Sequence, residues 1–265
     1  MANAPMNEMN AFEDKLRQRV AQKNNPLETK PVHVKPQGSI PNTPLASATI
    51  AFILGGFFSA GLYITASDLI SLRISVPYQL GIYLSSWAFF HWAEFGVTAG
   101  WNLEKCTIDS YLLENGTMYH FAHATALFEY AISSYFFPGI KSYAYVSQVG
   151  LVVLLLGQVL RSWAMIQAST NFSHAVAFYK VEGHRLVTDG VYNYFRHPSY
   201  AGFFYWALGT QLLLQNPVSF FMFWAVMWRF FYNRTRAEEN ALIKFFGDDY
   251  RNYRKRVGTK IPFVP

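Results

Sequence analysis

The pattern of hydrophobic and polar positions divides the chain into a polar start, an apolar middle and a mixed, charged end. A helix that crosses a membrane needs about 20 mainly apolar residues. The sequence predicts four such helices, followed by a hairpin of two shorter apolar segments joined by Gln215-Asn216-Pro217. The six predicted segments are residues 45–66, 78–97, 118–137, 143–163, 200–214 and 218–231. We therefore expect an all-α integral membrane protein with about six membrane-embedded helices.

These segments give the chain three parts. Residues 1–44 are polar and carry prolines at intervals, which predicts a disordered tail. No apolar stretch follows the start, so we expect no signal peptide and insertion through an internal span. Residues 45–166 form the four-span region, where Gly55-Gly56 and Gly61 predict close helix packing. Residues 167–265 form the predicted catalytic region, with a polar loop, the short hairpin and an amphipathic tail.

Composition and charge support this reading. Hydrophobic residues make up 52% of the chain and charged residues 14%, whereas soluble domains carry about 25% charged residues. The net charge of +6 could suggest nucleic acid, but the basic residues flank apolar spans and follow no nucleic-acid-binding motif. Lys and Arg concentrate in the N-terminal tail and after Asn233. Both termini and the loop 167–198 are therefore predicted to be cytosolic, and no nucleic-acid partner is expected.

Metal binding is not expected from the distribution of possible ligands. A single cysteine, Cys106, excludes a disulfide within the chain and a cysteine-rich zinc site. His91 and Glu94 share a helix face, but no second pair lies in another span to complete a site. We expect a buried polar contact between helices there instead. His120 and His123 meet the same objection.

The segment Arg196-His197-Pro198 lies where the polar loop meets the fifth apolar segment. Pro198 suits the first position of a helix, and the free backbone N–H groups at a helix start favour an anion. Arg196 and His197 would add donors beside them, and Gly202 would let a ligand or another helix approach closely. These features predict a ligand site. A basic cap that follows the positive-inside rule explains the same residues equally well.

A second polar cluster follows the last apolar segment. Arg229 lies within an apolar run, where a charge is costly unless it reaches the surface or a polar cavity. Arg234 and Glu238 are four apart and share a helix face. Glu239 lies roughly 140° round the helix from Arg234 and points elsewhere. We predict that Glu238, and not Glu239, acts together with Arg234 on the same ligand. A solvated, salt-bridged end of a membrane helix would also explain these residues.

An ordered set of motifs fills about residues 165–265. They are Asn171-Phe172-Ser173-His174, His184-Arg185-Leu186-Val187-Thr188-Asp189-Gly190-Val191-Tyr192, Arg196-His197-Pro198-Ser199-Tyr200-Ala201-Gly202, Trp228-Arg229-Phe230-Phe231, Arg234-Thr235, Glu238-Glu239 and Phe245-Phe246-Gly247-Asp248-Asp249-Tyr250. In this order and spacing the chain resembles the isoprenylcysteine carboxyl methyltransferase family. The earlier spans match that family mainly in character.

The resemblance implies roles for individual residues. The residues it places around an S-adenosylmethionine cofactor are His184, Arg185, Leu186, Val187, Tyr192, His197, Pro198, Ser199, Tyr200 and Glu238. Arg234 is expected to bind the substrate carboxylate and to be the catalytic residue, with no metal involved. At Ala177 the family can place a polar residue that contacts the cofactor, whereas this chain has an apolar one.

The resemblance also implies a reaction and a place. Methyl transfer from S-adenosylmethionine to the C-terminal carboxylate of a prenylated cysteine, in processed CaaX proteins, would take place at the endoplasmic reticulum membrane. The isoprenoid is most stable in the bilayer, so we expect a lateral opening between helices. The first four spans would form one wall of this opening and the short hairpin the other.

Three alternatives remain on the residues alone. A sterol-type, NADPH-dependent double-bond reductase shares a similar ending but is generally longer, and this chain has no obvious site for a 2′-phosphate. A phospholipid N-methyltransferase would have an amine nucleophile that does not need Arg234. A transporter or lipid-binding scaffold would need polar residues that face one another across the spans, as His91, Glu94, His120, His123 and Glu129 could.

Overall fold

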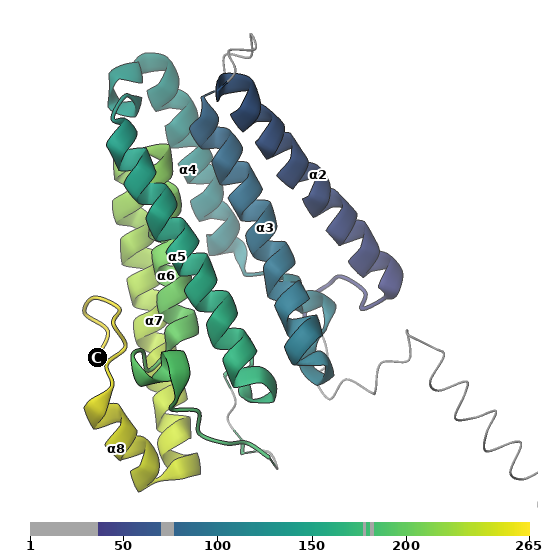
Figure 1. Ribbon diagram of the computed structural model, residues 1–265, viewed down its shortest axis with the longest axis vertical. Helices are drawn as coiled ribbons and strands as arrows, with labels where there is room; N and C mark the ends of the chain where they lie inside the picture. The colour runs from purple at the N-terminus through teal and green to yellow at the C-terminus, as the bar shows by residue number, and fades with distance from the viewer. Residues whose placement is uncertain (1–36, 70–76, 177–178, 181–182) are drawn as a thin grey trace, which may run out of the picture.

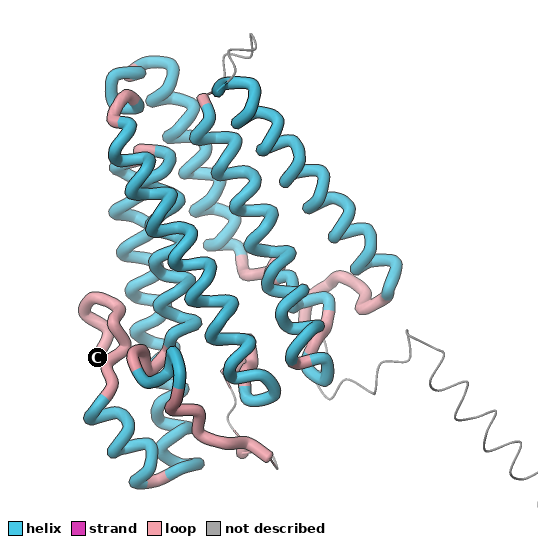
Figure 2. The backbone as a smooth tube through the Cα atoms, in the orientation of Figure 1, coloured by secondary structure: helices cyan, strands magenta, loops and turns pink. Residues whose placement is uncertain are grey.

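The computed structural model describes residues 37–69, 77–176, 179–180 and 183–265. These residues form helices and no strand (Figures 1 and 2), which confirms the all-α prediction for this part of the chain. The α-helices are α2 (Pro44–Leu69), α3 (Tyr78–Trp101), α4 (Thr117–Phe136), α5 (Ala144–Ala168), α6 (Pro198–Leu214), α7 (Pro217–Phe246) and α8 (Asp248–Arg256). Short 3-10 turns η1 (Leu103–Lys105), η2 (Ile108–Tyr111), η3 (Pro138–Lys141), η4 (Ser169–Asn171) and η5 (Gly190–Asn193) connect them.

The six long helices run side by side along one axis (Figure 1). Helix α2 lies at one edge against α3, and α5 packs against α6 within the bundle. The start of α2, the loop before α6 and helix α8 all lie at the same end of the bundle. Polar segments far apart in the sequence therefore gather at one end.

Two of the described helical stretches, Pro44–Asp68 and Ala144–Asn171, are long and apolar enough to cross a membrane. Large apolar side chains cover the outer surface, including Phe52, Phe128 and Leu156. Such a surface suits lipid better than water. Helix α6 has 17 residues, about 26 Å at 1.5 Å per residue, and is short for a span. Each predicted segment coincides with a helix, while six crossings remain a prediction.

Glycines allow α5 and α6 to approach closely. A Cβ atom at Gly157 would lie 2.5 Å from the backbone nitrogen of Trp206, and one at Gly202 would lie 2.6 Å from that of Arg161. Gly61 and Gly81 make the same kind of contact between α2 and α3, as expected for Gly61. The expectation for Gly55-Gly56 was wrong, because a Cβ atom at either position would meet nothing within 4 Å.

Helix α7 differs from the short second arm predicted for the hairpin. It runs unbroken through 30 residues, about 45 Å, from Pro217 to Phe246. The charged stretch after Asn233 contains good helix formers and no Gly or Pro before Gly247, so it continues the apolar helix. Gly247, at φ 56°, ends it. One rigid helix therefore joins the apolar part of the bundle to Glu238.

The connector between α6 and α7 is the tight turn that the sequence predicts. Gln215 takes the left-handed conformation, with φ 52°, and Pro217 begins α7. The ammonium of Lys141 donates to the carbonyls of Leu214 at 2.8 Å and Gln215 at 2.9 Å. Glu129 accepts hydrogen bonds from the first backbone N–H groups of α7. Both helix termini are thus capped by charged side chains of suitable sign.

Most of the predicted tail and Ala177 lie outside the described residues.

Candidate active site

A cavity lies where α6 begins, at the polar end of the bundle; we call it the α6 cavity. All ten residues predicted around the cofactor line it: His184, Arg185, Leu186, Val187, Tyr192, His197, Pro198, Ser199, Tyr200 and Glu238. Its other lining residues are Ala168, Asn171, Phe172, Ser173, Arg196, Leu242, Phe246, Tyr250 and Tyr253. The last four, from α7 and α8, were not predicted around the cofactor, although Phe246 and Tyr250 belong to a motif that carries the resemblance.

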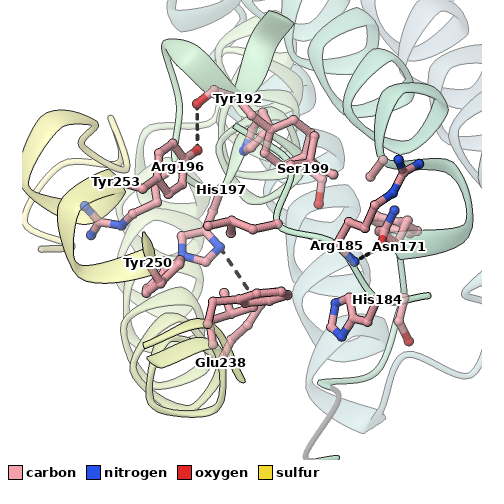
Figure 3. Close-up of a pocket in the computed structure, with 18 of the residues that line it drawn as sticks. Asn171, His184, Arg185, Tyr192, Arg196, His197, Ser199, Glu238, Tyr250 and Tyr253 are labelled. Atoms are coloured by element: carbon pink, nitrogen blue, oxygen red, sulfur yellow. Dashed lines mark hydrogen bonds and ion pairs between the residues drawn. The ribbon is translucent and has the colours of Figure 1, made fainter. Parts of the chain in front are cut away.

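The start of α6 forms one wall. His197 is the N-cap residue and Pro198 occupies the first turn, as the sequence predicts. The His197 ring stacks on Tyr200 one turn later, with ring centroids 5.2 Å apart and planes at 6°. His197 also lies between two carboxylates, with Nδ1 3.7 Å from Glu238 and Nε2 3.2 Å from Glu239. Figure 3 shows His197 facing Glu238 across this side of the cavity.

Arg196 lines the cavity, but most of its guanidinium donors bond within the chain, which leaves fewer of them for an anion than expected. Its guanidinium donates to Glu239 and, at 2.6 Å each, to the carbonyls of Val257 and Pro265. Burial opposes ionisation of Glu239, but His197 and Arg196 outweigh it, so the pKa of Glu239 lies below its ordinary value. Arg196 and Glu239 therefore fasten the C-terminal segment to the start of α6.

The opposite wall comes from the polar loop before η5. The Arg185 backbone N–H donates to the side-chain oxygen of Asn171 at 2.8 Å, which holds the loop against the end of α5 (Figure 3). His184 packs edge-on against Phe246, with centroids 5.4 Å apart. Burial, helped by Lys105 and Lys180, lowers the pKa of His184 below its ordinary value. His184 is therefore neutral at pH 7 and able both to donate and to accept.

Arg234 and Glu238 meet at one hydroxyl group. The Nε of Arg234 donates to the Tyr200 hydroxyl at 2.8 Å, and this hydroxyl donates to the carboxylate of Glu238. The Arg234 guanidinium also donates to the carbonyl of His174. Glu239 does not line the α6 cavity, and its carboxylate bonds to Arg196 and His197 instead of Arg234. Arg229 is exposed and lines none of the cavities described here.

A small cavity surrounds Arg234; we call it the Arg234 cavity. It is lined by Leu112, Asn115, Arg161, Phe172, Ser173, His174, Ser199, Tyr200, Phe203, Phe230, Phe231 and Arg234. It shares Phe172, Ser173, Ser199 and Tyr200 with the α6 cavity. The predicted carboxylate-binding arginine is therefore adjacent to the predicted cofactor residues.

Next to it, an apolar groove lies between α4, α6 and α7. It is lined by Asn115, Met118, Tyr119, Ala122, His123, Phe203, Trp206, Ala207, Phe223, Val226, Met227 and Phe230. The groove shares Asn115, Phe203 and Phe230 with the Arg234 cavity. Its walls are α4 on one side and the α6–α7 hairpin on the other. The prediction that the first four spans form one wall was wrong, because α2, α3 and α5 contribute no residue to the lining.

A buried ion pair between Glu94 and Arg161 lies beside the Arg234 cavity. The sequence predicted a polar contact at Glu94 but not its partner. Both Glu94 oxygens accept hydrogen bonds from the Arg161 guanidinium, and Nη1 of Arg161 donates to the Ser199 carbonyl at 3.1 Å. His174 Nε2 lies 3.0 Å from Glu94. Opposite charges within two apolar segments are the signal that could have revealed the pair. The expected contact between helices at Glu94 is confirmed.

Two further histidines, His91 and His123, bond to other side chains and backbone groups. His91 lies 2.7 Å from both the Tyr111 carbonyl and the Tyr119 hydroxyl, and His123 lies 2.6 Å from the Tyr83 hydroxyl. In the part of the chain that the structure describes, no three His, Cys, Asp or Glu residues are grouped closely enough to hold a metal ion.

The fold and the cavities define an all-helical membrane protein with a polar site at one end of its helices. Comparison with known proteins identifies the family. The isoprenylcysteine carboxyl methyltransferase family matches residues 149–244. The protein-S-isoprenylcysteine O-methyltransferase of Homo sapiens is 40% identical, over 81% of this chain and 73% of the human protein. That of Schizosaccharomyces pombe is 40% identical over 84% of this chain and 98% of its own length.

A solved structure, described as the eukaryotic intramembrane Ras methyltransferase, isoprenylcysteine carboxyl methyltransferase, superposes with a TM-score of 0.77. It is 39% identical to this chain, and the match covers 82% of this chain and 76% of the solved chain. The chain belongs to the isoprenylcysteine carboxyl methyltransferase family. It is a membrane-embedded methyltransferase.

Proposed function

We propose that this chain transfers a methyl group from S-adenosylmethionine to the C-terminal carboxylate of a prenylated cysteine in processed CaaX proteins, giving a methyl ester. The observation that carries the proposal is the position of the Arg234 cavity. It adjoins the α6 cavity through Ser199 and Tyr200, and the apolar groove through Phe203 and Phe230. A carboxylate bound at Arg234 would therefore lie between a donor site and a lipid site.

The lining of the α6 cavity suits S-adenosylmethionine. Glu238 offers a negative charge to the ammonium or the sulfonium, and the start of α6 favours the carboxylate. The buried His184 Nδ1 has no hydrogen-bond partner among the described residues, so it is available to a ligand. The cavity measures about 100 Å³, below the roughly 300 Å³ usual for ligand sites, so its walls must move apart on binding.

Bound S-adenosylmethionine supplies a methyl group activated by its positively charged sulfur. The nucleophile needs no general base, because a C-terminal carboxyl group has an unperturbed pKa of about 3.5 and is ionised at pH 7. What this chain provides is alignment of the carboxylate for in-line attack. Arg234 donates from Nε to Tyr200 and from Nη2 to His174, so its Nη1 group remains for the substrate.

The apolar groove supports a site for the isoprenoid. Its lining is almost entirely apolar, with Met118, Ala122, Phe223 and Met227 on facing helices. The groove would keep the isoprenoid out of water, where exposure costs about 0.8 kcal/mol for each CH₂ group. A groove between helices would also let the lipid enter from the bilayer.

We place the enzyme in the endoplasmic reticulum membrane because the family resemblance implies it, and the same arrangement supports cytosolic termini. The start of α2 and helix α8 lie at the same end of the bundle as the start of α6 (Figure 1), whose first residues line the α6 cavity. Basic residues concentrate in the N-terminal tail and beyond Asn233, and the positive-inside rule places such segments in the cytosol. Methylation there would remove a negative charge from the lipid anchor and strengthen its attachment to an anionic leaflet.

The test is an assay of the purified protein with S-adenosylmethionine carrying a tritiated methyl group and N-acetyl-farnesylcysteine. A sterol and a phospholipid serve as alternative acceptors. We expect a base-labile methyl ester on the prenylcysteine and no label on the other two acceptors. Absence of that ester would contradict the proposed function.

A further inference from the structure

A third cavity reaches the Arg234 cavity and has no role in the reaction described so far. We call it the polar vestibule. It measures about 540 Å³ and lies beside η1 and η2, at the polar end of the bundle. Its lining includes Asn102, Lys105, Asp109 and Glu114. It shares Leu112, Ser173 and His174 with the Arg234 cavity. The Arg234 cavity therefore adjoins three others: the α6 cavity, the apolar groove and the polar vestibule.

A prenylated C-terminal cysteine also bears three groups. Its carboxylate is assigned to Arg234, and its thioether-linked lipid is assigned to the apolar groove. The third group is the polypeptide that precedes the cysteine. We propose that the polar vestibule binds this peptide segment in an extended form, with a preference for basic side chains. This inference rests on the proposed function.

The vestibule offers unused acceptors to a peptide backbone. Asn102 Oδ1 and Asp109 Oδ1 are buried and have no hydrogen-bond partner among the described residues. An unsatisfied buried polar atom is costly, so a ligand with N–H groups would be favoured. The Asp109 and Glu114 carboxylates already accept backbone N–H groups from this chain, at 2.6 Å from Gln37 and 2.7 Å from Ser39. These carboxylates thus already bind backbone N–H groups on one side of the vestibule, and Asp109 Oδ1 remains for a ligand.

The charge balance favours a basic peptide. Asp109 and Glu114 both line the vestibule. The opposing cation, Lys105, donates to the carbonyls of Thr170 at 2.6 Å and Phe172 at 2.9 Å. Its ammonium is thereby engaged by two backbone carbonyls. A Lys or Arg side chain of the substrate would therefore meet carboxylates, whereas an acidic one would be repelled.

Two substrates test whether the vestibule is used. One is N-acetyl-farnesylcysteine, and the other is a six-residue peptide that ends in farnesylcysteine and contains two lysines. In the unmodified protein we expect kcat/KM to be about tenfold higher for the peptide, as one or two added hydrogen bonds would give. Failure to methylate either substrate would refute the proposed function, whereas equal kcat/KM values would refute only the vestibule.

Two variants with matched controls locate the effect. Ala175→Trp places a bulky ring at an exposed position that lines the vestibule, and Ala144→Trp does the same at an exposed position on the far end of α5. We expect Ala175→Trp to lower the ratio of the two kcat/KM values to about one, and Ala144→Trp to preserve it. The inference fails if both variants preserve the ratio or both lower it.

Charge reversal tests the preference for basic peptides. Glu114→Lys changes a residue of the vestibule, whereas Asp249→Lys changes an exposed carboxylate on α8 that does not line it. With peptides containing two Lys or two Glu at about 0.15 M salt, we expect Glu114→Lys to abolish the preference for Lys and Asp249→Lys to retain it. If both variants lost the preference for Lys equally, the overall charge of the surface and not the vestibule would set it, and the assignment would be overturned.

Discussion

Arg234 Nε donates to the hydroxyl oxygen of Tyr200 at 2.8 Å, and the same hydroxyl donates to Glu238. One phenol group therefore connects the predicted substrate-binding residue to a predicted cofactor-binding residue. The Arg234 guanidinium also lies over the Tyr200 ring, 5.3 Å from its centroid. Because α7 carries both charged residues and α6 carries the tyrosine, helix packing fixes the distance between the two sites.

Tyr200→Phe removes the hydroxyl but keeps the ring that stacks on His197. Arg234 and Glu238 each lose a hydrogen bond, so the carboxylate acceptor should be poorly aligned in a protein that still folds. We expect kcat for N-acetyl-farnesylcysteine to fall about 10- to 100-fold with little change in Tm. Steady-state kinetics and a thermal melt measure the two quantities. Unchanged kcat would contradict the bridging role.

Arg234→Lys keeps the charge but loses the planar fork that can hold a carboxylate through two hydrogen bonds. We expect kcat/KM for the prenylcysteine to fall about 100-fold, while the affinity for S-adenosylmethionine stays within about twofold. Equilibrium binding of the cofactor provides the second readout. Arg236→Lys is the control, because Arg236 is exposed and bonds to Tyr232. Parallel loss of cofactor binding would show that Arg234 serves the donor site.

Glu238→Gln removes the negative charge on the α7 side of the α6 cavity. S-adenosylmethionine carries an ammonium and a sulfonium, so we expect its affinity to fall about tenfold. Glu239→Gln should alter this affinity much less, since Glu239 bonds to Arg196 and His197 and does not line the cavity. Calorimetry on both variants gives the comparison. Equal losses of affinity would contradict the division of roles between adjacent glutamates.

Glu239 should instead contribute to stability in a pH-dependent manner. Its folded pKa is depressed below the ordinary 4.5, so its ionised form stabilises the fold above that value, and this contribution is lost as the pH falls through the folded pKa. We expect Glu239→Gln to lower Tm by about 5 °C at about pH 7, and the difference from the unmodified protein to shrink towards about pH 3. A constant difference across this range would show that ionisation is not involved. Glu104→Gln, at an exposed position, is the control.

Local pattern in the sequence predicted the helices well and their continuity less well. Apolar length located all six segments, and Pro198 and Gly247 mark helix ends. The apolar run before Asn233 ends in the middle of α7, because hydropathy changes there while helix propensity does not. Lipid contact and helix continuity are therefore separate properties of a chain.

The candidate site was predictable where residues adjacent in sequence line one cavity, as at His197–Tyr200. It was less predictable where partners come from distant helices. Nothing near Arg196 in the sequence indicates that Glu239, Val257 and Pro265 would occupy its donors. Such pairings depend on which helices pack together, and this depends on small residues whose effect is seen only in three dimensions.

Gly202 is such a residue, and its substitution tests how packing supports the site. A Cβ atom there would lie 2.6 Å from the backbone nitrogen of Arg161 and 2.8 Å from the carbonyl of Gly157, so α5 and α6 would have to separate. The Arg161 hydrogen bond to the Ser199 carbonyl spans the same contact. We expect Gly202→Ala to destabilise the protein by about 1–3 kcal/mol and to weaken cofactor binding in parallel. Gly100→Ala, where a Cβ meets nothing within 4 Å, should leave both unchanged or slightly raise Tm. If Gly202→Ala melted at the unmodified temperature, the close approach of α5 and α6 would not be what holds the start of α6 in place.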